Sequence, residues 1–231
     1  MTAIAPSLLP GTHFAWQHFR SDGCPDASRL PEVLRLAPVL RQTSYLAGRE
    51  CAVRALQEAG CRPSPNVGRT PQGLPDWPPH MTGSITHTLV PQHDEPSGLA
   101  IALVGARQDF RSLAIDLEPV MAAAQSDQVK AILVSANEAQ LGSRLGIAAP
   151  LWTIRIYGLK EALFKMLFCE AGVPKPFDAA EVLSFDPGTG QACLILREDW
   201  GQLRAGKRFW LHSGMFQGCV LSVGGWSANA G

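Results

Sequence analysis

Two short acidic segments hold the residues of this chain that are best suited to chemistry. Asp116 and Glu118 stand two positions apart in an Ile-Asp-Leu-Glu segment, and Glu161 lies between Lys160 and Lys165 in a second one. Mg²⁺ is usually held by one or two carboxylates together with the phosphates of a substrate. Lysines beside such an ion neutralise charge on transferring phosphoryl groups. The two segments therefore predict a Mg²⁺ site that binds a pyrophosphate and breaks it.

The first acidic segment is predicted to be a buried strand. Because side chains alternate between the faces of a strand, Leu113, Ile115 and Leu117 should point into the core. Asp116 and Glu118 then share the other face, with Cα atoms about 6–7 Å apart. Carboxylates that close repel each other unless a cation lies between them or water solvates them. An edge strand with a solvated polar face is the alternative interpretation of this segment.

The second acidic segment falls in a helix predicted over residues 151–170 and ended by Gly172. Apolar and aromatic side chains cover most of this helix, and only Lys160, Glu161 and Lys165 interrupt them. Glu161 and Lys165 could form a simple surface ion pair, worth about 0.3–0.5 kcal/mol. Charges on a mostly buried helix, however, need partners or a ligand. The pattern therefore favours a functional role.

Earlier parts of the chain offer candidates for binding an anion. A helix predicted over residues 39–59, ended by Gly60, carries Arg41 and Arg49 eight positions apart and so on one face. Exposed arginines on a helix also serve solubility, which is the alternative for this pair.

A loop rich in proline and glycine, residues 61–82, follows that helix and carries Arg69. The next segment is Gly83-Ser-Ile-Thr-His, in which Thr86 offers a hydroxyl and His87 an imidazole to a phosphate. A turn whose histidine caps the following strand explains this segment equally well. His80, in the loop, belongs to no motif and is expected to be a surface residue.

Composition excludes several classes of protein. Lys+Arg and Asp+Glu number 20 each, so no overall charge attracts nucleic acid or an anionic membrane. The six cysteines form no C-x-x-C pair, which favours buried structural thiols. Neither a transmembrane stretch nor a signal peptide is expected, and the predicted location is the cytoplasm.

The order of predicted elements indicates an α+β protein of two halves, residues 1–111 and 112–231. Strands are expected at residues 99–104 and 113–118, and a weaker helix at residues 120–145. Four short β-type runs then fill the tail, at residues 181–185, 192–196, 208–212 and 219–223.

Taken together, these motifs resemble the 4′-phosphopantetheinyl transferases, and most closely the enterobactin-synthase component D-like branch of the surfactin type. The resemblance runs from about residue 38 to 185. In order, it consists of Arg-x7-Arg on a helix, a Pro/Gly loop with Trp-Pro, Gly-Ser-Ile-Thr-His, Ile-Asp-Leu-Glu and Lys-Glu-Ala-Leu-Phe-Lys. Two departures stand before the last motif: Tyr157 replaces a Trp or Phe, and Arg155-Ile-Tyr-Gly replaces the commoner Phe-Ser-Ala.

The resemblance implies an activity and an architecture. Such enzymes move 4′-phosphopantetheine from coenzyme A to a serine of an apo acyl or peptidyl carrier protein and release adenosine 3′,5′-bisphosphate. The carriers expected are those of siderophore, polyketide or nonribosomal peptide synthesis. The fold implied is a monomeric pseudo-dimer of two similar α/β halves, with coenzyme A and the active site in the cleft between them.

The resemblance also implies roles for individual residues. Asp116, Glu118 and Glu161 would hold Mg²⁺ or Mn²⁺. Lys165 would stabilise or protonate the leaving phosphate, and Glu161 or Glu138 would act through water as the base. Coenzyme A would be bound by residues of both halves: Arg41, Arg49, Arg69, Thr86, His87 and Lys160.

Two other functions fit part of this pattern. A metal-dependent nuclease also uses Asp, Glu and Lys, but its common pattern places Glu-x-Lys on a strand soon after the Asp. Here the Lys-Glu pair lies on a helix some forty residues later. A non-catalytic module that binds coenzyme A or a carrier would keep the basic residues and lose a metal carboxylate, whereas all three carboxylates are present.

Overall fold

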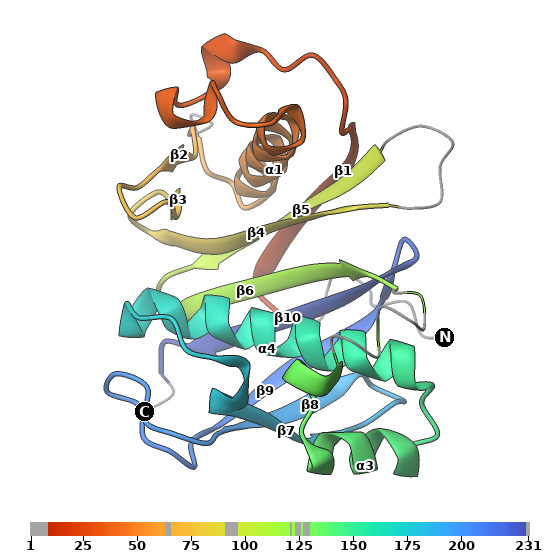
Figure 1. The fold of residues 1–231 in the computed structure, drawn as a ribbon. Coiled ribbons are helices and arrows are strands. Elements are labelled where there is room, and N and C mark those ends of the chain that lie inside the picture. Colours follow the sequence, from red (N-terminus) through yellow and green to blue (C-terminus); the bar gives the residue numbers. More distant parts are fainter. Residues whose placement is uncertain are drawn as a thin grey trace. The chain divides into compact units, whose positions relative to one another are not determined.

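A computed structural model of the chain describes residues 9–62, 66–90, 97–120, 122, 126 and 130–229. They form two compact units, an N-terminal unit containing Leu9–Leu113 and a C-terminal unit containing Ala114–Trp226. Each unit combines helix with antiparallel sheet (Figure 1), which confirms the α+β class. Each also has its own hydrophobic core. The similarity of the two halves stays a prediction.

The N-terminal unit is one long helix packed on a three-stranded sheet (Figure 1). The sheet order is β1 (Thr12–Arg20), β5 (Ser97–Ala106) and β4 (Met81–Leu89), all antiparallel. The helix is α1 (Val39–Glu58). The smaller elements are the 3₁₀ turns η1 (Ala27–Arg29) and η2 (Glu32–Leu34) and the two-residue strands β2 (Gly68–Arg69) and β3 (Pro75–Asp76).

Helix α1 ends where the sequence predicted. Gly60 takes the left-handed conformation, with φ at +82°, and Cys61 N–H reaches back to the carbonyl of Leu56 at 3.0 Å. Glycine ends helices in this way because it has no Cβ to oppose a positive φ. Within the helix, a Cβ on Gly48 would lie only 2.7 Å from Cγ2 of Ile85. Glycine therefore lets α1 approach β4 closely.

The Gly83-Ser-Ile-Thr-His segment is not a turn, which excludes the alternative interpretation of it. It lies inside the nine-residue strand β4, where Gly83 pairs with Val104 and His87 with Ala100 of β5. A Cβ on Gly83 would lie 2.5 Å from the carbonyl oxygen of Leu103, so crowding in the sheet requires the glycine. Pairing with β5 decides the conformation here, and it outweighs the turn preference of Gly and Ser.

The C-terminal unit is built on a five-stranded sheet ordered β6-β10-β9-β8-β7, in which the pairs β10–β9, β9–β8 and β8–β7 are antiparallel. Figure 1 shows α4 running along this sheet, and α4 packs against β9, β7 and the shorter helix α3. The strands are β6 (Phe110–Pro119, in this unit from Ala114), β7 (Ala180–Phe185), β8 (Gln191–Leu196), β9 (Arg208–Phe216) and β10 (Cys219–Ser227). The helices are α3 (Ala136–Arg144), α4 (Ala149–Ala171) and the 3₁₀ turn η3 (Phe177–Ala179).

Helix α4 is the centre of this unit. It begins at Ala149 with a proline in its first turn and ends at Gly172, whose φ of +66° and N–H bond to Phe168 close the last turn. Leu159, Leu163 and other apolar residues of α4 are fully buried in the core. The helix predicted over residues 151–170 is confirmed. Of the weaker helix expected over 120–145, α3 covers the end, and residues 121, 123–125 and 127–129 lie outside the described part.

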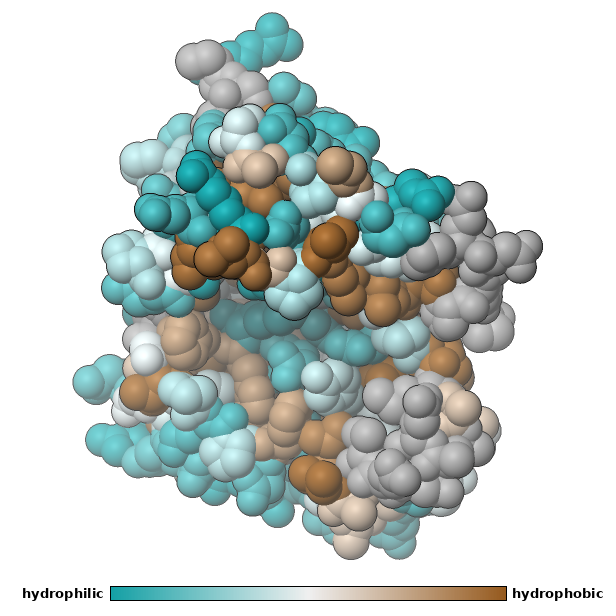
Figure 2. Space-filling view, turned by 45° about the horizontal axis from the view of Figure 1, so that its top comes forward, coloured by the Kyte–Doolittle hydropathy of each residue, from teal (hydrophilic) through white to brown (hydrophobic). Residues whose placement is uncertain are grey.

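On the face drawn in Figure 2, hydrophobic residues form several patches between hydrophilic ones. In the described part of the chain no helix is both long and apolar enough to span a bilayer. Five cysteines of the described residues are free thiols, four of them buried. The expectation of buried thiols is confirmed for those four, whereas Cys24 is exposed.

Candidate functional site

Strand β6 places Asp116 at the centre of an acidic group in the C-terminal unit. Leu113, Ile115 and Leu117 are buried as expected, but so are Ser112 and Ala114, so burial does not alternate along the strand. Asp116 is also buried, at 3% exposure, because α4 covers its side of the strand with Lys165. The Nζ of Lys165 donates to Oδ1 of Asp116 at 2.5 Å and to the carbonyl of Ile115 at 3.2 Å.

Glu118 and Glu161 lie within electrostatic range of this pair. Burial, and then the charge of Asp116, raise the pKa of Glu118 to about 8, while Lys165 opposes the shift and Glu161 adds to it. Burial and Asp116 likewise raise the pKa of Glu161, again against Lys165. The three carboxylates repel one another, and only one ammonium lies among them. When they are ionised, the site therefore carries more negative than positive charge.

The backbone around Asp116 leaves room beside its second oxygen. Among the described residues, Oδ2 of Asp116 and Oγ of Ser222 are both buried without a hydrogen-bond partner. A Cβ on Gly158 of α4 would lie 2.9 Å from that Oγ and 3.4 Å from that Oδ2. The two oxygens without a hydrogen-bond partner therefore both lie beside Gly158, the residue of α4 that has no side chain. Next to it, burial and then Glu161 raise the pKa of Tyr157.

The described residues contain no group of three His, Cys, Asp or Glu side chains already gathered as a metal centre. The donor set nevertheless suits a hard divalent cation. Asp116 Oδ2 is a buried acceptor with nothing to accept from, and Glu118 and Glu161 would be relieved of repulsion by positive charge. Asp116, Glu118 and Glu161 thus fit Mg²⁺ chemically, with Lys165 supplying part of the charge in its absence.

Glu138 and Lys160 form a separate, wholly buried ion pair. The Nζ of Lys160 lies 3.1 Å from Oε2 of Glu138, and the two side chains are 2% and 0% exposed. Lys160 also donates to the carbonyl of Leu133, and Glu138 accepts the N–H groups of Ser135 and Val182. Every polar atom of the pair is engaged inside the fold. The expectations that Lys160 binds pyrophosphate and that Glu138 acts as a base find no support in this geometry.

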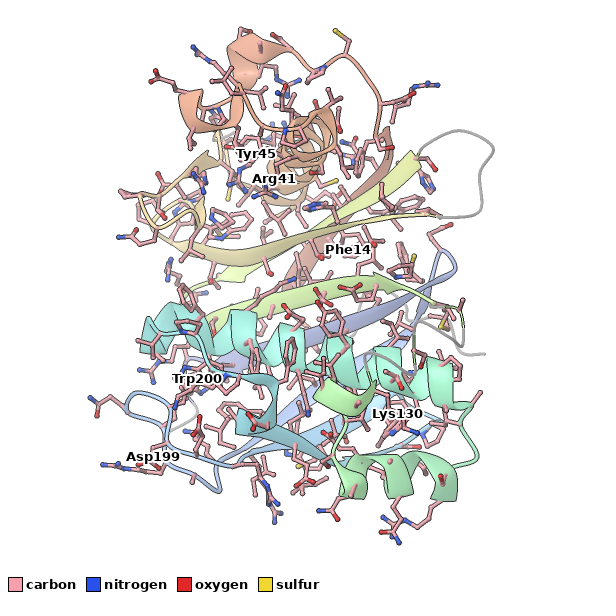
Figure 3. All side chains as sticks on the ribbon, viewed as in Figure 1. Phe14, Arg41, Tyr45, Lys130, Asp199 and Trp200 are labelled. Atoms are coloured by element: carbon pink, nitrogen blue, oxygen red, sulfur yellow. The ribbon has the colours of Figure 1, made fainter. Side chains whose placement is uncertain are left out.

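In the N-terminal unit, α1 presents two of the predicted phosphate ligands. Arg41 is exposed, and the guanidinium of Arg49 lies over the ring of Tyr45, 4.7 Å from its centroid. Arg41 and Tyr45 are both marked on α1 in Figure 3. The Nε of Arg49 is buried with no hydrogen-bond partner among the described residues. A buried guanidinium N–H without an acceptor is costly unless a ligand supplies one.

Thr86 and His87 of β4 point to opposite faces of the sheet. Ile85 faces α1, as its approach to Gly48 shows, so His87 lies on the same face as Ile85 and Thr86 on the other. The side chains of Thr86 and His87 therefore do not lie together on one side of the sheet. Arg69, exposed on β2, extends over Gly73, where a Cβ would lie 2.7 Å from its Nη2.

Sequence reasoning missed two contributors to the acidic group. Ser222, on β10, belongs to no motif, and only the pairing of β10 with β6 brings it near Asp116. Gly158 was noticed only as a departure from a pattern, although a glycine in a helix that is otherwise apolar signals close packing.

Comparison with known proteins gives matches in both units. Residues 30–94 match the family model of the 4′-phosphopantetheinyl transferase N-terminal domain, and residues 112–210 that of the 4′-phosphopantetheinyl transferase superfamily. The chain is similar to 4′-phosphopantetheinyl transferase PptT of Mycobacterium tuberculosis, with 32% identity over 71% of this chain and 70% of the relative.

Two further relatives are similar over a smaller share of their length. Enterobactin synthase component D of Salmonella typhi is 28% identical over 66% of this chain and 59% of its own. 4′-Phosphopantetheinyl transferase Svp of Streptomyces mobaraensis is 33% identical over 65% of this chain and 57% of its own. The chain thus spans less than two thirds of these two relatives.

Proposed function

Because the chain belongs to the 4′-phosphopantetheinyl transferase superfamily, we propose that it transfers 4′-phosphopantetheine from coenzyme A to a serine of an apo carrier protein. The products are the holo-carrier and adenosine 3′,5′-bisphosphate. One observation carries the proposal: Asp116, Glu118 and Glu161 act on one another's charge beside Lys165. All four residues lie in the segment that matches the superfamily.

The reaction is a phosphoryl transfer with a simple balance. The serine oxygen of the carrier forms a bond to the phosphorus that bears pantetheine, and the bond from that phosphorus to the bridging oxygen of the pyrophosphate breaks. The bridging oxygen leaves with the nucleotide. Such reactions depend mainly on positioning and on neutralising charge at the phosphate oxygens. The ammonium of Lys165, 32% exposed, is suited to neutralise or protonate the leaving oxygen.

Asp116, Glu118 and Glu161 are the residues that would hold Mg²⁺ in this proposal. When bound, the ion supplies positive charge to the pyrophosphate and to the carboxylates themselves. The buried Oδ2 of Asp116 supports this role, because it has no other partner among the described residues.

The serine proton needs an acceptor, and Glu161 is our choice. Acting through a water, as its place among the proposed Mg²⁺ ligands allows, it takes the proton of the attacking serine. Glu138, the other candidate from the sequence, has its carboxylate occupied by Lys160 and two backbone N–H groups.

Coenzyme A is held, in this proposal, by the basic and hydroxyl side chains of the N-terminal unit. Arg49 is the best supported of them, since its buried Nε lacks an acceptor among the described residues. Arg41 and His87 complete the set for the 3′-phosphate, and Thr86 and Arg69 are assigned to the nucleotide end. Arginine suits phosphate because its planar fork donates in pairs.

The carrier is assigned by class only. One relative is a component of enterobactin synthase, which favours a carrier of a siderophore or another nonribosomal peptide over one of fatty-acid synthesis. A non-catalytic module that binds coenzyme A or carriers is the second candidate, and the intact set of three carboxylates argues against it.

Intact-mass spectrometry tests the proposal. Apo carrier domains from peptide, polyketide and fatty-acid synthases are incubated with the protein and coenzyme A, with Mg²⁺ or with excess chelator. We expect a mass gain of one phosphopantetheinyl group that needs Mg²⁺ and maps to the carrier serine. Coenzyme A binding by calorimetry without a gain on any carrier would favour the binding module.

A further inference from the structure

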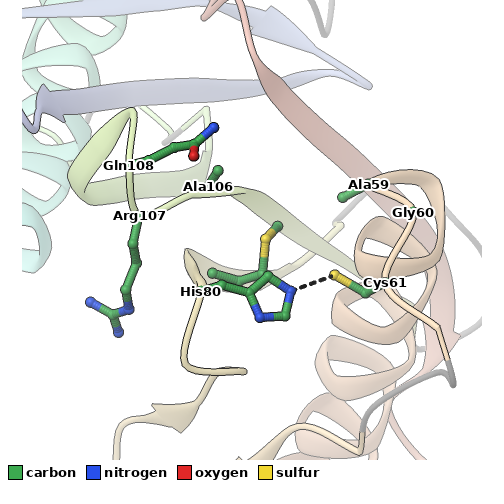
Figure 4. Close-up of a pocket in the computed structure, with 8 residues that line it drawn as sticks. Ala59, Gly60, Cys61, His80, Ala106, Arg107 and Gln108 are labelled. Carbon is green, nitrogen blue, oxygen red and sulfur yellow. Dashed lines mark hydrogen bonds between the residues drawn. The ribbon is translucent and has the colours of Figure 1, made fainter.

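A pocket outside the acidic group lies in the N-terminal unit, where α1 ends beside the β5–β6 turn (Figure 4). It has a volume of about 340 Å³ and is lined by Ala59, Gly60, Cys61, His80, Met81, Ala106, Arg107 and Gln108. None of these residues takes part in the proposed transfer. The lining brings together a thiol, an imidazole and a guanidinium from segments far apart in the sequence.

Cys61 and His80 are in direct contact. Figure 4 shows the imidazole turned toward the thiol, with Sγ of Cys61 3.6 Å from Nε2 of His80. Cys61 is 9% exposed and borders the pocket, whereas His80 is exposed to solvent. A thiol that can pass its proton to a neighbouring imidazole reacts as the thiolate, which is the nucleophilic form.

The pocket favours negatively charged reactants. Its lining contains Arg107 and His80, and none of the residues described as lining it is acidic. The N–H of Arg107 donates to the carbonyl of His80 at 2.9 Å, which ties the β5–β6 turn to the segment that carries the imidazole. The backbone of Arg107 is therefore tied to the pocket, and its guanidinium, which Figure 4 shows turned away from the Cys61–His80 contact, adds positive charge beside the pocket rather than at the thiol.

We propose that Cys61, with His80 as its base, is a site of thiol–disulfide exchange with small anionic disulfides. The Cys61 thiol passes its proton to Nε2 of His80, and its sulfur then attacks one sulfur of the disulfide. A Cys61–S–S–R bond forms, the original S–S bond breaks, and the leaving thiolate takes the proton from His80. The disulfide is the oxidant, and the product is a mixed disulfide that a thiol reverses.

The other described cysteines offer no comparable setting. The thiols of Cys51 and Cys193 have pKa values raised mainly by burial, and burial together with Glu118 raises the pKa of Cys219 to about 11. Cys24 is the exposed thiol of the described set. If exposure alone controlled reactivity, Cys24 would react first, so Cys24 is the internal reference for Cys61.

The test uses the full chain and needs no variant for its first arm. The reduced protein is treated with oxidised glutathione at pH 7, quenched at intervals and mapped by peptide mass spectrometry. We expect Cys61 to be glutathionylated faster than Cys24, and dithiothreitol to reverse the modification. If Cys24 is modified at the same rate or faster, the proposal is overturned.

Two variants separate the base from the pocket charge. His80→Asn should slow modification of Cys61 about tenfold and leave Cys24 unchanged, because the proton acceptor is lost; His13→Asn is the matched control. Arg107→Gln should slow the reaction of Cys61 with oxidised glutathione, which is anionic, more than its reaction with neutral 2,2′-dithiodipyridine. Circular dichroism checks that both variants fold. An unchanged Cys61 rate in folded His80→Asn would refute the role of the imidazole.

Discussion

The Nζ of Lys165 and the Oδ1 of Asp116 are 2.5 Å apart, and the same ammonium opposes the rise in the pKa of Glu118 and of Glu161. One lysine thus serves three carboxylates in the C-terminal unit. A single charge cannot balance three, and the second oxygen of Asp116 is left without a donor among the described residues. The acidic group therefore needs additional positive charge, which a divalent cation would supply.

Asp116→Asn should lower the rate of carrier modification at least about 100-fold, because it removes a charged ligand and the partner of Lys165. The variant should also lose affinity for Mn²⁺, used as a paramagnetic probe of the Mg²⁺ site. Initial rates and Mn²⁺ titration by electron paramagnetic resonance measure the two effects. Asp178→Asn, on η3, is the control. A variant that keeps full activity would exclude Asp116 as a metal ligand.

Glu138→Gln and Lys160→Met should each destabilise the fold by about 3–5 kcal/mol, since each leaves an uncompensated buried charge. The double variant should be less destabilised than the sum of the two. Urea unfolding gives the free energies for the cycle. Glu161→Gln is the matched control, and it should abolish transfer with little loss of stability. If Glu138→Gln were stable and inactive instead, a direct catalytic role for Glu138 would regain support.

Stability of the metal-free protein should respond to the charge of Glu118. Its pKa in the folded protein is about 8, above the ordinary 4.5, so folding favours the protonated form. This stabilising contribution is complete below pH 4.5 and is lost as the pH rises to about 8. Mg²⁺ should stabilise the protein more at pH 8 than at pH 6, because it needs ionised carboxylates.

Denaturant unfolding in chelator, at steps from pH 5 to 8, compares wild type with Glu118→Gln. We expect the free-energy difference between the variant and wild type to grow with pH in favour of the variant. Wild type must be compared with the variant because His212 also makes stability depend on pH. Burial lowers the pKa of His212, so its contribution to stability increases as the pH rises, opposite to that of Glu118. A difference that does not change with pH would contradict the raised pKa.

Gly158→Ala should weaken the acidic group although alanine favours helix by about 1 kcal/mol. The added Cβ would lie 2.9 Å from Oγ of Ser222 and 3.4 Å from Oδ2 of Asp116, so one of them must move. We expect lower kcat and weaker Mn²⁺ binding. Adding Ser222→Gly should restore part of both, since it removes the crowded hydroxyl. Without such rescue, the contact with Ser222 is not what Gly158 protects.

Arg49→Gln should raise the KM for coenzyme A about tenfold if its guanidinium binds the 3′-phosphate. With 3′-dephospho-coenzyme A as the donor, the variant and wild type should differ little, because the phosphate contact is absent from both. Steady-state kinetics on one carrier give the four constants. Arg35→Gln, an exposed arginine before α1, is the control. An equal loss with both donors would place Arg49 elsewhere on the nucleotide.

Much of this fold was predictable because local signals and tertiary packing agree. Gly60 and Gly172 end the two long helices as predicted, and Leu113, Ile115 and Leu117 are buried as expected. The grouping of Asp116, Glu118 and Glu161 was predictable from residue type and spacing, and their role as metal ligands stays a prediction.

What could not be predicted depends on partners distant in sequence. The sequence offers Lys160 to a ligand, whereas the structure pairs it with Glu138, 22 residues away. Ser222 approaches Asp116 only because β10 lies beside β6, and His80 meets Cys61 across a loop with no motif. In each case the sequence contained the residue but no local pattern that named its partner.

The buried bond from Lys160 to Glu138 also sets the rotation of α4 about its own axis. Successive residues of an α-helix are turned by about 100°, so fixing the direction of Lys160 fixes that of Glu161. A helix held only by apolar contacts can rotate slightly with little change in energy. Rotation of α4 would instead break the ion pair, because Lys160 is also bonded to the carbonyl of Leu133 and Glu138 to the N–H of Val182. Of these two adjacent residues of opposite charge, Lys160 fixes the rotation of the helix, and half-buried Glu161 is thereby held in the acidic group with Asp116.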